Sequence, residues 1–144
     1  MRVEGRWHSF DDGVLRPVID GAIQTSAGTW QGVTFLLDAG ADRTVFDASF
    51  LSLLSSLALP ESETPGVSGV GGRVGCLFVP ARLSLVRDDG NQVFINGPFG
   101  VFADAASSDI SVLGRDVTNN FEVIYSYSKR QVVLLAPPQT YRIH

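Results

Sequence analysis

The stretch that decides the fold is an apolar run that enters a tight acidic turn: Phe35-Leu36-Leu37-Asp38-Ala39-Gly40-Ala41-Asp42-Arg43-Thr44-Val45. The apolar residues predict a core strand over Trp30–Leu37, which breaks at Asp38. An acid followed by small residues at this point holds a carboxylate at the end of a rigid element. Gly40 in addition allows another backbone to come close. Taken alone, an Asp followed closely by a Gly is also typical of an ordinary turn.

On both sides of this stretch, short β-prone runs alternate with Gly, Asp, Asn and Pro, which favours an all-β domain with many turns. The other expected strands are Val14–Thr25, Cys76–Val86, Gln92–Asn96, Phe99–Ala103, Ile110–Leu113, Phe121–Tyr125 and Gln131–Leu135. The run Val14–Thr25 reads as one or two strands, with Asp20-Gly21 as a bend. A glycine-rich hairpin is expected over residues 66–75.

One helix is predicted over Asp47–Leu57, with Asp47 as its cap and Pro60 beyond its end. Its apolar residues recur at helical spacing and form one face: Phe50, Leu51, Leu54 and Leu57. A further helical turn is expected within Arg115–Asn120.

Length and composition fit one globular domain. The chain has 144 residues, of which 44% are hydrophobic and only 18% charged. We expect an N-terminal arm over residues 1–13, the main domain over residues 14–136 and a C-terminal tail over residues 137–144.

The charge pattern excludes several classes of function. The net charge is −4 and Lys129 is the only lysine, so no basic patch for nucleic acid or an anionic membrane is predicted. No apolar run is long enough to span a membrane, and no signal peptide is expected. The single cysteine, Cys76, excludes an internal disulfide and is expected to be an inert core thiol in a cytoplasmic protein. His8 and His144 lie far apart in the sequence, so neither a metal nor a cofactor is predicted.

Three motifs in order resemble the retropepsin-like aspartic protease family. The stretch around Asp38 resembles its apolar-Asp-Thr/Ser-Gly-Ala motif. Gly69-Val70-Gly71-Gly72 lies where the family carries its flap, the hairpin that covers the substrate. Ser111-Val112-Leu113-Gly114-Arg115-Asp116 resembles the apolar-Gly-Arg-Asp/Asn signature that packs beneath the catalytic loop. Together the motifs span most of the chain.

The resemblance implies a closed, β-barrel-like acid protease fold with one short helix and a function as a homodimer. Two aspartates, one from each chain, would share one proton and activate a water molecule for peptide hydrolysis. The ionised carboxylate acts as the base and the protonated one donates to the scissile carbonyl. Because this chain has one such motif, a symmetric dimer with Asp38 near the two-fold axis follows from the mechanism. The expected substrate is an extended peptide bound by strand pairing.

Further site residues follow from the resemblance. Asp42 and Arg115 match an acid and an arginine that pair within a subunit, which we expect to be a partly buried bidentate pair. Gly114 should be small so that its strand can cross under the Asp38 loop, which Gly40 and Ala41 complete. The backbone amides of Gly71 and Gly72 would hold the substrate through water.

Position 39 departs from the family, because Ala39 stands where Thr or Ser is usual. In the family this hydroxyl donates a hydrogen bond to the opposite catalytic loop, and Ala39 has no donor. An alternative reading is therefore a catalytically weak or inactive domain used for dimerisation or peptide binding. A third reading is a β-barrel unrelated to proteases, in which Asp38 is only a turn residue.

Overall fold

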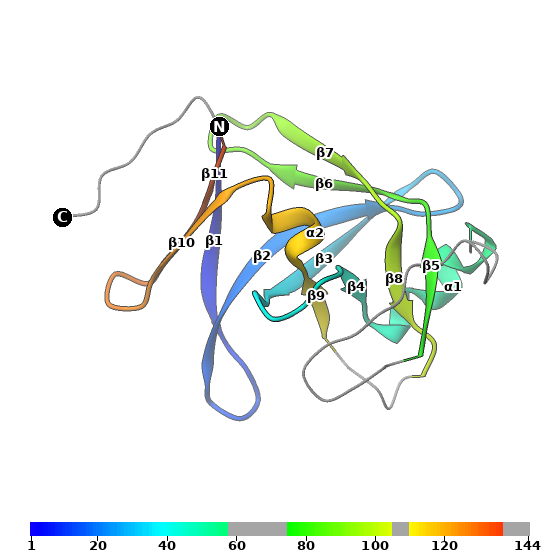
Figure 1. The fold of residues 1–144 in the computed structure, drawn as a ribbon, viewed down its shortest axis with the longest axis horizontal. Coiled ribbons are helices and arrows are strands. Elements are labelled where there is room, and N and C mark those ends of the chain that lie inside the picture. Colours follow the sequence, from blue (N-terminus) through cyan, green and yellow to red (C-terminus); the bar gives the residue numbers. More distant parts are fainter. Residues whose placement is uncertain (58–74, 105–109, 137–144) are drawn as a thin grey trace.

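The computed structural model describes residues 1–57, 75–104 and 110–136, which form a mostly β fold with short helical segments (Figure 1). The strands are β1 (Arg2–Ser9), β2 (Leu15–Gln24), β3 (Trp30–Leu37), β4 (Val45–Phe46), β5 (Cys76–Val79), β6 (Arg82–Val86), β7 (Gln92–Asn96), β8 (Phe99–Phe102), β9 (Ser111–Leu113), β10 (Glu122–Ser126) and β11 (Gln131–Leu135). The helical segments are η1 (Ala48–Phe50), α1 (Leu51–Leu54), η2 (Ser55–Leu57) and α2 (Arg115–Thr118).

The first three strands form an antiparallel meander, and β2 is one uninterrupted strand. Asp20 pairs with Thr34 and Gly21 pairs with Val33, so the expected bend at Asp20-Gly21 is wrong. A Cβ at position 21 would lie 2.8 Å from the Ser84 carbonyl oxygen. Position 21 is therefore a glycine because β6, which also pairs with β2, comes close to it. It does not form a turn.

The centre of the fold is a parallel pairing between β3 and β9, two strands far apart in the sequence. Leu37 lies beside Leu113, so the two strands end together and deliver residues 38 and 114 to the same edge of the sheet. Strand β4 packs next to β9 in the opposite direction and continues the sheet to β8. This arrangement, visible at the middle of Figure 1, fixes the position of the Asp38 turn.

Aromatic side chains fill the core between these strands and the helical segment. The Phe46 ring lies 5.3 Å from the rings of Phe35 and Phe50 and 6.1 Å from that of Phe99. Phe50 and Leu54 are buried, which confirms the predicted apolar face. Asp47 caps the segment by accepting a hydrogen bond from the Ser49 amide, as predicted, but most of the segment is 3₁₀ in character, with a single turn of α-helix.

The expected long strand over Cys76–Val86 is divided in two. Strand β5 pairs with β8, whereas β6 pairs with β7 and β2. Pro80 lies at the break, where its missing N–H cannot contribute to a ladder. The break lets the chain change partners and turn toward a different part of the sheet.

Strand β1 joins the β10–β11 hairpin to the rest of the sheet. Its first half pairs with β11 and its second half with β2. Residues 2–9 of the expected N-terminal arm thus form β1, and Val3 is buried in the core. Strand β11 lies between β1 and β10 in the sheet, near the N-terminus in Figure 1.

Among the described residues, the strand path runs from β10 to β5 with β6 and β7 as a branch, and it does not return on itself. The closed barrel that was expected is therefore not shown. Within the same residues, no helix is long and apolar enough to cross a membrane.

The remaining elements follow the sequence closely. Strands β7, β8 and β9, the helical turn α2 and the β10–β11 hairpin all form where they were predicted. The glycine-rich hairpin, apart from Gly75, and the tail over residues 137–144 lie outside the described residues.

Gly114 lies where β9 passes under the loop that follows Asp38. A Cβ at this position would lie 2.4 Å, 2.5 Å and 2.9 Å from the backbone carbon, oxygen and nitrogen of Arg43. Because these are backbone atoms, they cannot rotate away as a side chain could. The contact allows no side chain at position 114.

We expect Gly114→Ala to lower the free energy of unfolding by roughly 3 kcal/mol, because overpacking against backbone atoms forces the loop to shift. Urea denaturation measures this change. The control is Gly32→Ala, since a Cβ there meets nothing within 4 Å. Gly32→Ala should be neutral or stabilising by up to about 0.5 kcal/mol. Similar losses for both variants would show that the Arg43 contact does not constrain position 114.

Candidate active site

The loop after β3 and the loop after β9 are joined by backbone hydrogen bonds. The Asp38 amide donates to the Leu113 carbonyl at 3.3 Å, and the Arg115 amide donates to the Ala41 carbonyl at 2.9 Å. The Asp116 amide donates to the Asp42 carbonyl at 3.2 Å. The two motifs are therefore adjacent in space, as the sequence predicted.

Asp38 lies half-buried at the end of β3, in a turn closed by its own backbone. The Ala41 amide donates to the Asp38 carbonyl at 3.2 Å, and the Gly40 amide donates to the carboxylate oxygen Oδ1 at 2.8 Å. Among the described residues, the bond from the Gly40 amide is the one that orients the carboxylate. The other carboxylate oxygen remains available to a water molecule or to a second carboxyl group.

A buried threonine, whose role the sequence does not indicate, joins the two loops. Thr44 is fully buried; its hydroxyl donates to the Asp116 carboxylate at 2.7 Å and accepts from the Gly114 amide at 3.0 Å. The Thr44 amide also donates to both Asp116 oxygens, at 2.9 Å and 3.0 Å. The only signal in the sequence was a Thr placed six residues after Asp38. A Thr at this spacing does not by itself indicate a buried network.

Arg115 and Asp42 form the predicted ion pair, but its geometry differs from the prediction. One guanidinium nitrogen contacts the Asp42 carboxylate, while another donates to the Ala39 carbonyl at 3.3 Å. The side chains are 48% and 45% exposed, so the pair is not buried in the single chain. The expectation of a partly buried bidentate pair is thus wrong for one chain. Arg115 instead donates to Ala39 near the start of the Asp38 turn and to Asp42 at its end.

The charge of Asp38 acts on Tyr125, a link that the sequence did not reveal. Burial, followed by the negative charge of Asp38, raises the pKa of the Tyr125 phenol. Tyr125 belongs to β10 and is 45% exposed. A hairpin residue that far along the chain carries no motif, and only the fold brings it toward the Asp38 turn.

A cavity of about 320 Å³ lies on the same side of β3 as Asp38. Leu36 and Asp38 are two residues apart, so their side chains point to the same face, whereas Phe35 and Leu37 point into the core. The cavity is lined by Phe10, Asp11, Asp12, Arg16, Leu36 and Ile110. Its wall is apolar near β3 and charged at the β1–β2 turn.

The charged end of this cavity is an ion pair. Two Arg16 nitrogens donate to the two Asp12 oxygens, at 3.1 Å and 2.6 Å. These bonds, together with the Val14 amide, lower the pKa of Asp12 to about 2. Asp12 therefore stays ionised in moderately acidic solution.

The predicted flap residues Gly69, Val70, Gly71 and Gly72 lie outside the described residues. Among residues 1–57, 75–104 and 110–136, no group of three His, Cys, Asp or Glu side chains could hold a metal ion.

No family model and no curated protein matches the chain. Among solved structures, it is similar to a retropepsin-like aspartic protease from Rickettsia conorii, with 17% identity and a TM-score of 0.51 over 93% of this chain and 90% of that one. It also matches EIAV protease complexed with the inhibitor HBY-793, with 21% identity and a TM-score of 0.46, over 78% of this chain and 92% of that one. At these identities the similarity concerns the fold.

We expect Thr44→Val to lower the free energy of unfolding by about 2–3 kcal/mol. The change keeps the shape of the side chain but leaves the buried Gly114 amide without an acceptor and removes one donor from Asp116. Thermal or urea denaturation measures the loss. Thr34→Val is the control, because the Thr34 hydroxyl donates to Asp20 at the surface, and it should change stability by less than about 1 kcal/mol. Equal effects of the two changes would contradict a fastening role for Thr44.

Proposed function

From the retropepsin-like fold of this chain, we propose that two copies form an aspartic endopeptidase, with the Asp38 carboxylate of each copy in one shared active site. The observation that carries the proposal is the placement of Asp38. It stands at the end of a core strand, its carboxylate is oriented by the Gly40 amide, and it retains access to solvent. A turn residue without a function needs no such support from a second, distant loop.

The chemistry requires a pair of carboxyl groups. Two carboxylates held within hydrogen-bonding reach do not both ionise, so the pair keeps one proton. The ionised member removes a proton from a water molecule, which attacks the carbonyl carbon of the scissile bond. The protonated member donates to the carbonyl oxygen. Collapse of the resulting diol, with a proton passed to the leaving nitrogen, yields one acid and one amine.

A symmetric dimer supplies this pair most simply. Within the described residues, Asp12-Gly13 and Asp89-Gly90 lie in surface turns and Asp20-Gly21 lies inside β2, so none of them repeats the setting of Asp38. A two-fold axis that passes near the 38–42 turns brings the two Asp38 side chains together. The same axis could bury the exposed Asp42–Arg115 pairs, since each lies in the same turn region as Asp38.

Substrate binding in the proposed enzyme uses both sides of this axis. The cavity beside Leu36 takes a substrate side chain, because it opens on the face of β3 that carries Asp38. The glycine-rich segment Gly69–Gly72 would form the flap, whose backbone amides hold an extended peptide from above. Support for the flap comes from its place in the sequence between the two joined motifs.

A reducing, cytoplasmic setting is part of the proposal. Cys76 is a free thiol on β5, and burial raises its pKa. Such a thiol is poorly reactive and needs no disulfide partner.

A second candidate function is a peptide-binding or dimerisation domain without turnover. Ala39 favours it, since a methyl group cannot donate the hydrogen bond that Thr or Ser would supply across the dimer. Ala39 is exposed, and its carbonyl accepts from Arg115. A less firmly held pair of turns would place the two carboxylates less rigidly, and catalysis would then be slow or absent.

We expect Asp38→Asn to reduce peptide cleavage by at least about 10²- to 10⁴-fold, because an amide can act neither as the base nor as the shared acid. Cleavage of a mixed peptide pool at acidic to neutral pH, followed by mass spectrometry, measures the loss. The melting temperature should stay nearly unchanged.

Asp89→Asn is the matched control, since Asp89 is also an Asp before a Gly but lies in the β6–β7 turn. It should leave cleavage at the wild-type rate. Cleavage activity that survives Asp38→Asn would contradict the assignment of Asp38 as the catalytic residue. If the wild type binds peptides without cleaving them, the second candidate function is supported.

We expect Ala39→Thr to tighten the dimer. A hydroxyl restores one hydrogen bond per copy at about 1 kcal/mol each, which together lower the dimer Kd by roughly 30-fold. Sedimentation equilibrium measures the Kd. Ala39→Val is the control because Val has the shape of Thr without its hydroxyl, and it should not tighten the dimer. Equal dimer Kd values for the Thr and Val variants would argue against this role for position 39.

A further inference from the structure

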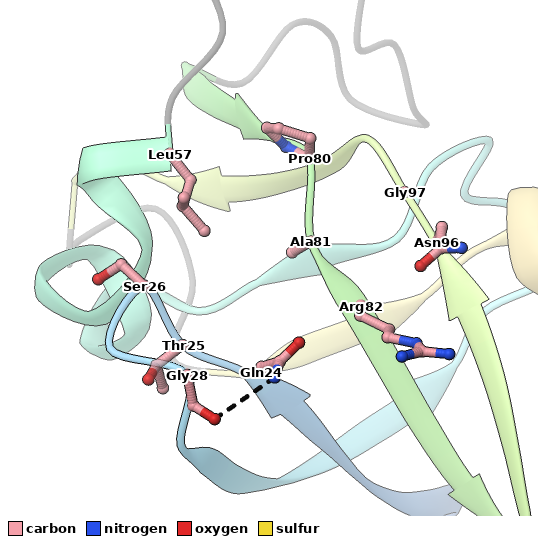
Figure 2. Close-up of a pocket in the computed structure, with 10 residues that line it drawn as sticks. All are labelled: Gln24, Thr25, Ser26, Gly28, Leu57, Pro80, Ala81, Arg82, Asn96 and Gly97. Carbon is pink, nitrogen blue, oxygen red and sulfur yellow. Dashed lines mark hydrogen bonds between the residues drawn. The ribbon is translucent and has the colours of Figure 1, made fainter.

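A second cavity, of about 560 Å³, lies at the opposite end of the sheet from Asp38 (Figure 2). It is bordered by the β2–β3 turn, the end of η2, the break between β5 and β6, and the end of β7. Gln24, one of its lining residues, pairs with Trp30 at the start of β3. Since β3 has eight residues at about 3.3 Å each, the cavity is roughly 25 Å from Asp38. It is therefore separate from the proposed active site.

Three polar side chains reach this cavity from one face of the sheet. Arg82 and Asn96 are cross-strand partners, so their side chains point the same way. Two residues further along β6, Ser84 pairs with Ala22, which lies two residues before Gln24 on β2. By the alternation of strands, Gln24 shares that face. Figure 2 shows Gln24 below the cavity, and Arg82 and Asn96 to its right.

Arg82 differs in its surroundings from most arginines of the described chain. Arg2, Arg6, Arg16, Arg87 and Arg115 each pair with a carboxylate. No carboxylate within the described ranges pairs with Arg82, whose guanidinium lies over the Phe94 ring at 4.2 Å from its centroid. The stacking contact fixes the guanidinium plane and leaves its N–H groups free to donate.

The amides beside Arg82 add further donors. In the part of the chain that the structure describes, the Asn96 side chain makes no hydrogen bond, and the Gln24 amide makes one long bond of 3.4 Å to the Gly28 carbonyl. The aliphatic residues that line the cavity are Leu57, Pro80 and Ala81, and the polar residues Thr25 and Ser26 line it near Leu57. Figure 2 shows Leu57 projecting from the short helix toward the cavity. The cavity thus combines a cation and amide donors with aliphatic lining residues.

We propose that this cavity binds a carboxylate on a short aliphatic stem, the chemistry of a glutamate side chain. The carboxylate would lie against the Arg82 guanidinium and the Asn96 amide, since a planar fork of N–H donors matches two carboxylate oxygens. The methylene groups would lie against the cavity lining beside Arg82, where Ala81 is the adjacent apolar residue. Such a group can come from an acidic residue of a peptide or from a free dicarboxylic acid. The proposal does not depend on catalysis at Asp38.

The test is an NMR titration of the ¹⁵N-labelled protein, observed at the side-chain amides of Asn96 and Gln24. One series uses glutarate and another uses the peptide acetyl-Ala-Glu-Ala-amide; glutaramide and the corresponding Gln peptide are the neutral controls. Carboxylate ligands should shift these resonances with saturation, and the neutral ligands should not. Tighter binding of the peptide assigns the site to acidic peptides, whereas tighter binding of glutarate assigns it to free dicarboxylates.

Variants locate the site. Arg82→Gln should weaken binding by at least about tenfold, because a charge-assisted bond is lost, and Arg82→Lys should fall between it and the wild type. Lys129→Gln, a change of charge in the β10–β11 turn, should leave binding unchanged. The proposal is overturned by the absence of saturable shifts with both carboxylate ligands. Equal binding of the neutral ligands, or wild-type affinity in the folded Arg82→Gln protein, would overturn it as well.

Discussion

The hydroxyl of Thr44 is the point on which the candidate site depends. It joins loops that are about seventy residues apart in the sequence, through a donated bond to Asp116 and an accepted bond from Gly114. The Thr44 hydroxyl thus bonds both the buried Gly114 amide and the Asp116 carboxylate. A buried polar group left without a partner lowers the stability of the fold by more than an ordinary hydrogen bond adds to it. Because Gly114 admits no Cβ, the two loops can approach closely enough for this bond to form. That closure holds the loop after Asp38 against the loop after β9, to which the Asp38 amide is also bonded.

Local patterns predicted much of the fold because they depend on neighbouring residues. The strand Trp30–Leu37 was predicted to the residue, and the Asp47 cap and the β10–β11 hairpin were also found as expected. The errors arose where tertiary contacts decide whether a segment forms a strand or a turn. Asp20-Gly21 looks like a turn in the sequence, but β6 needs a glycine at that place in β2. Pro80 interrupts a run that is otherwise uniformly β-prone.

The candidate site was predicted only in part, because its local motifs are visible in the sequence and its tertiary contacts are not. The motif around Asp38 and the Gly-Arg-Asp segment could be read from the sequence, and the structure brings them together. Thr44 and Tyr125 were not recognised, because a single Thr or Tyr has no signature before the fold is known. The Arg115–Asp42 pair was recognised, but its exposure in one chain was not. Charge and spacing alone do not reveal how much water a pair of side chains retains.

The division of β1 between β11 and β2 has a consequence for biosynthesis. Arg2 pairs with Leu135, so residues at opposite ends of the described chain are neighbours in the sheet. During translation, the first half of β1 has no partner until β11 has left the ribosome, and Val3 stays exposed until then. Pairings over such sequence distances make folding slow, since a large loop entropy is lost before the contact forms. A nascent chain of this protein therefore cannot complete its sheet before β11 has emerged from the ribosome.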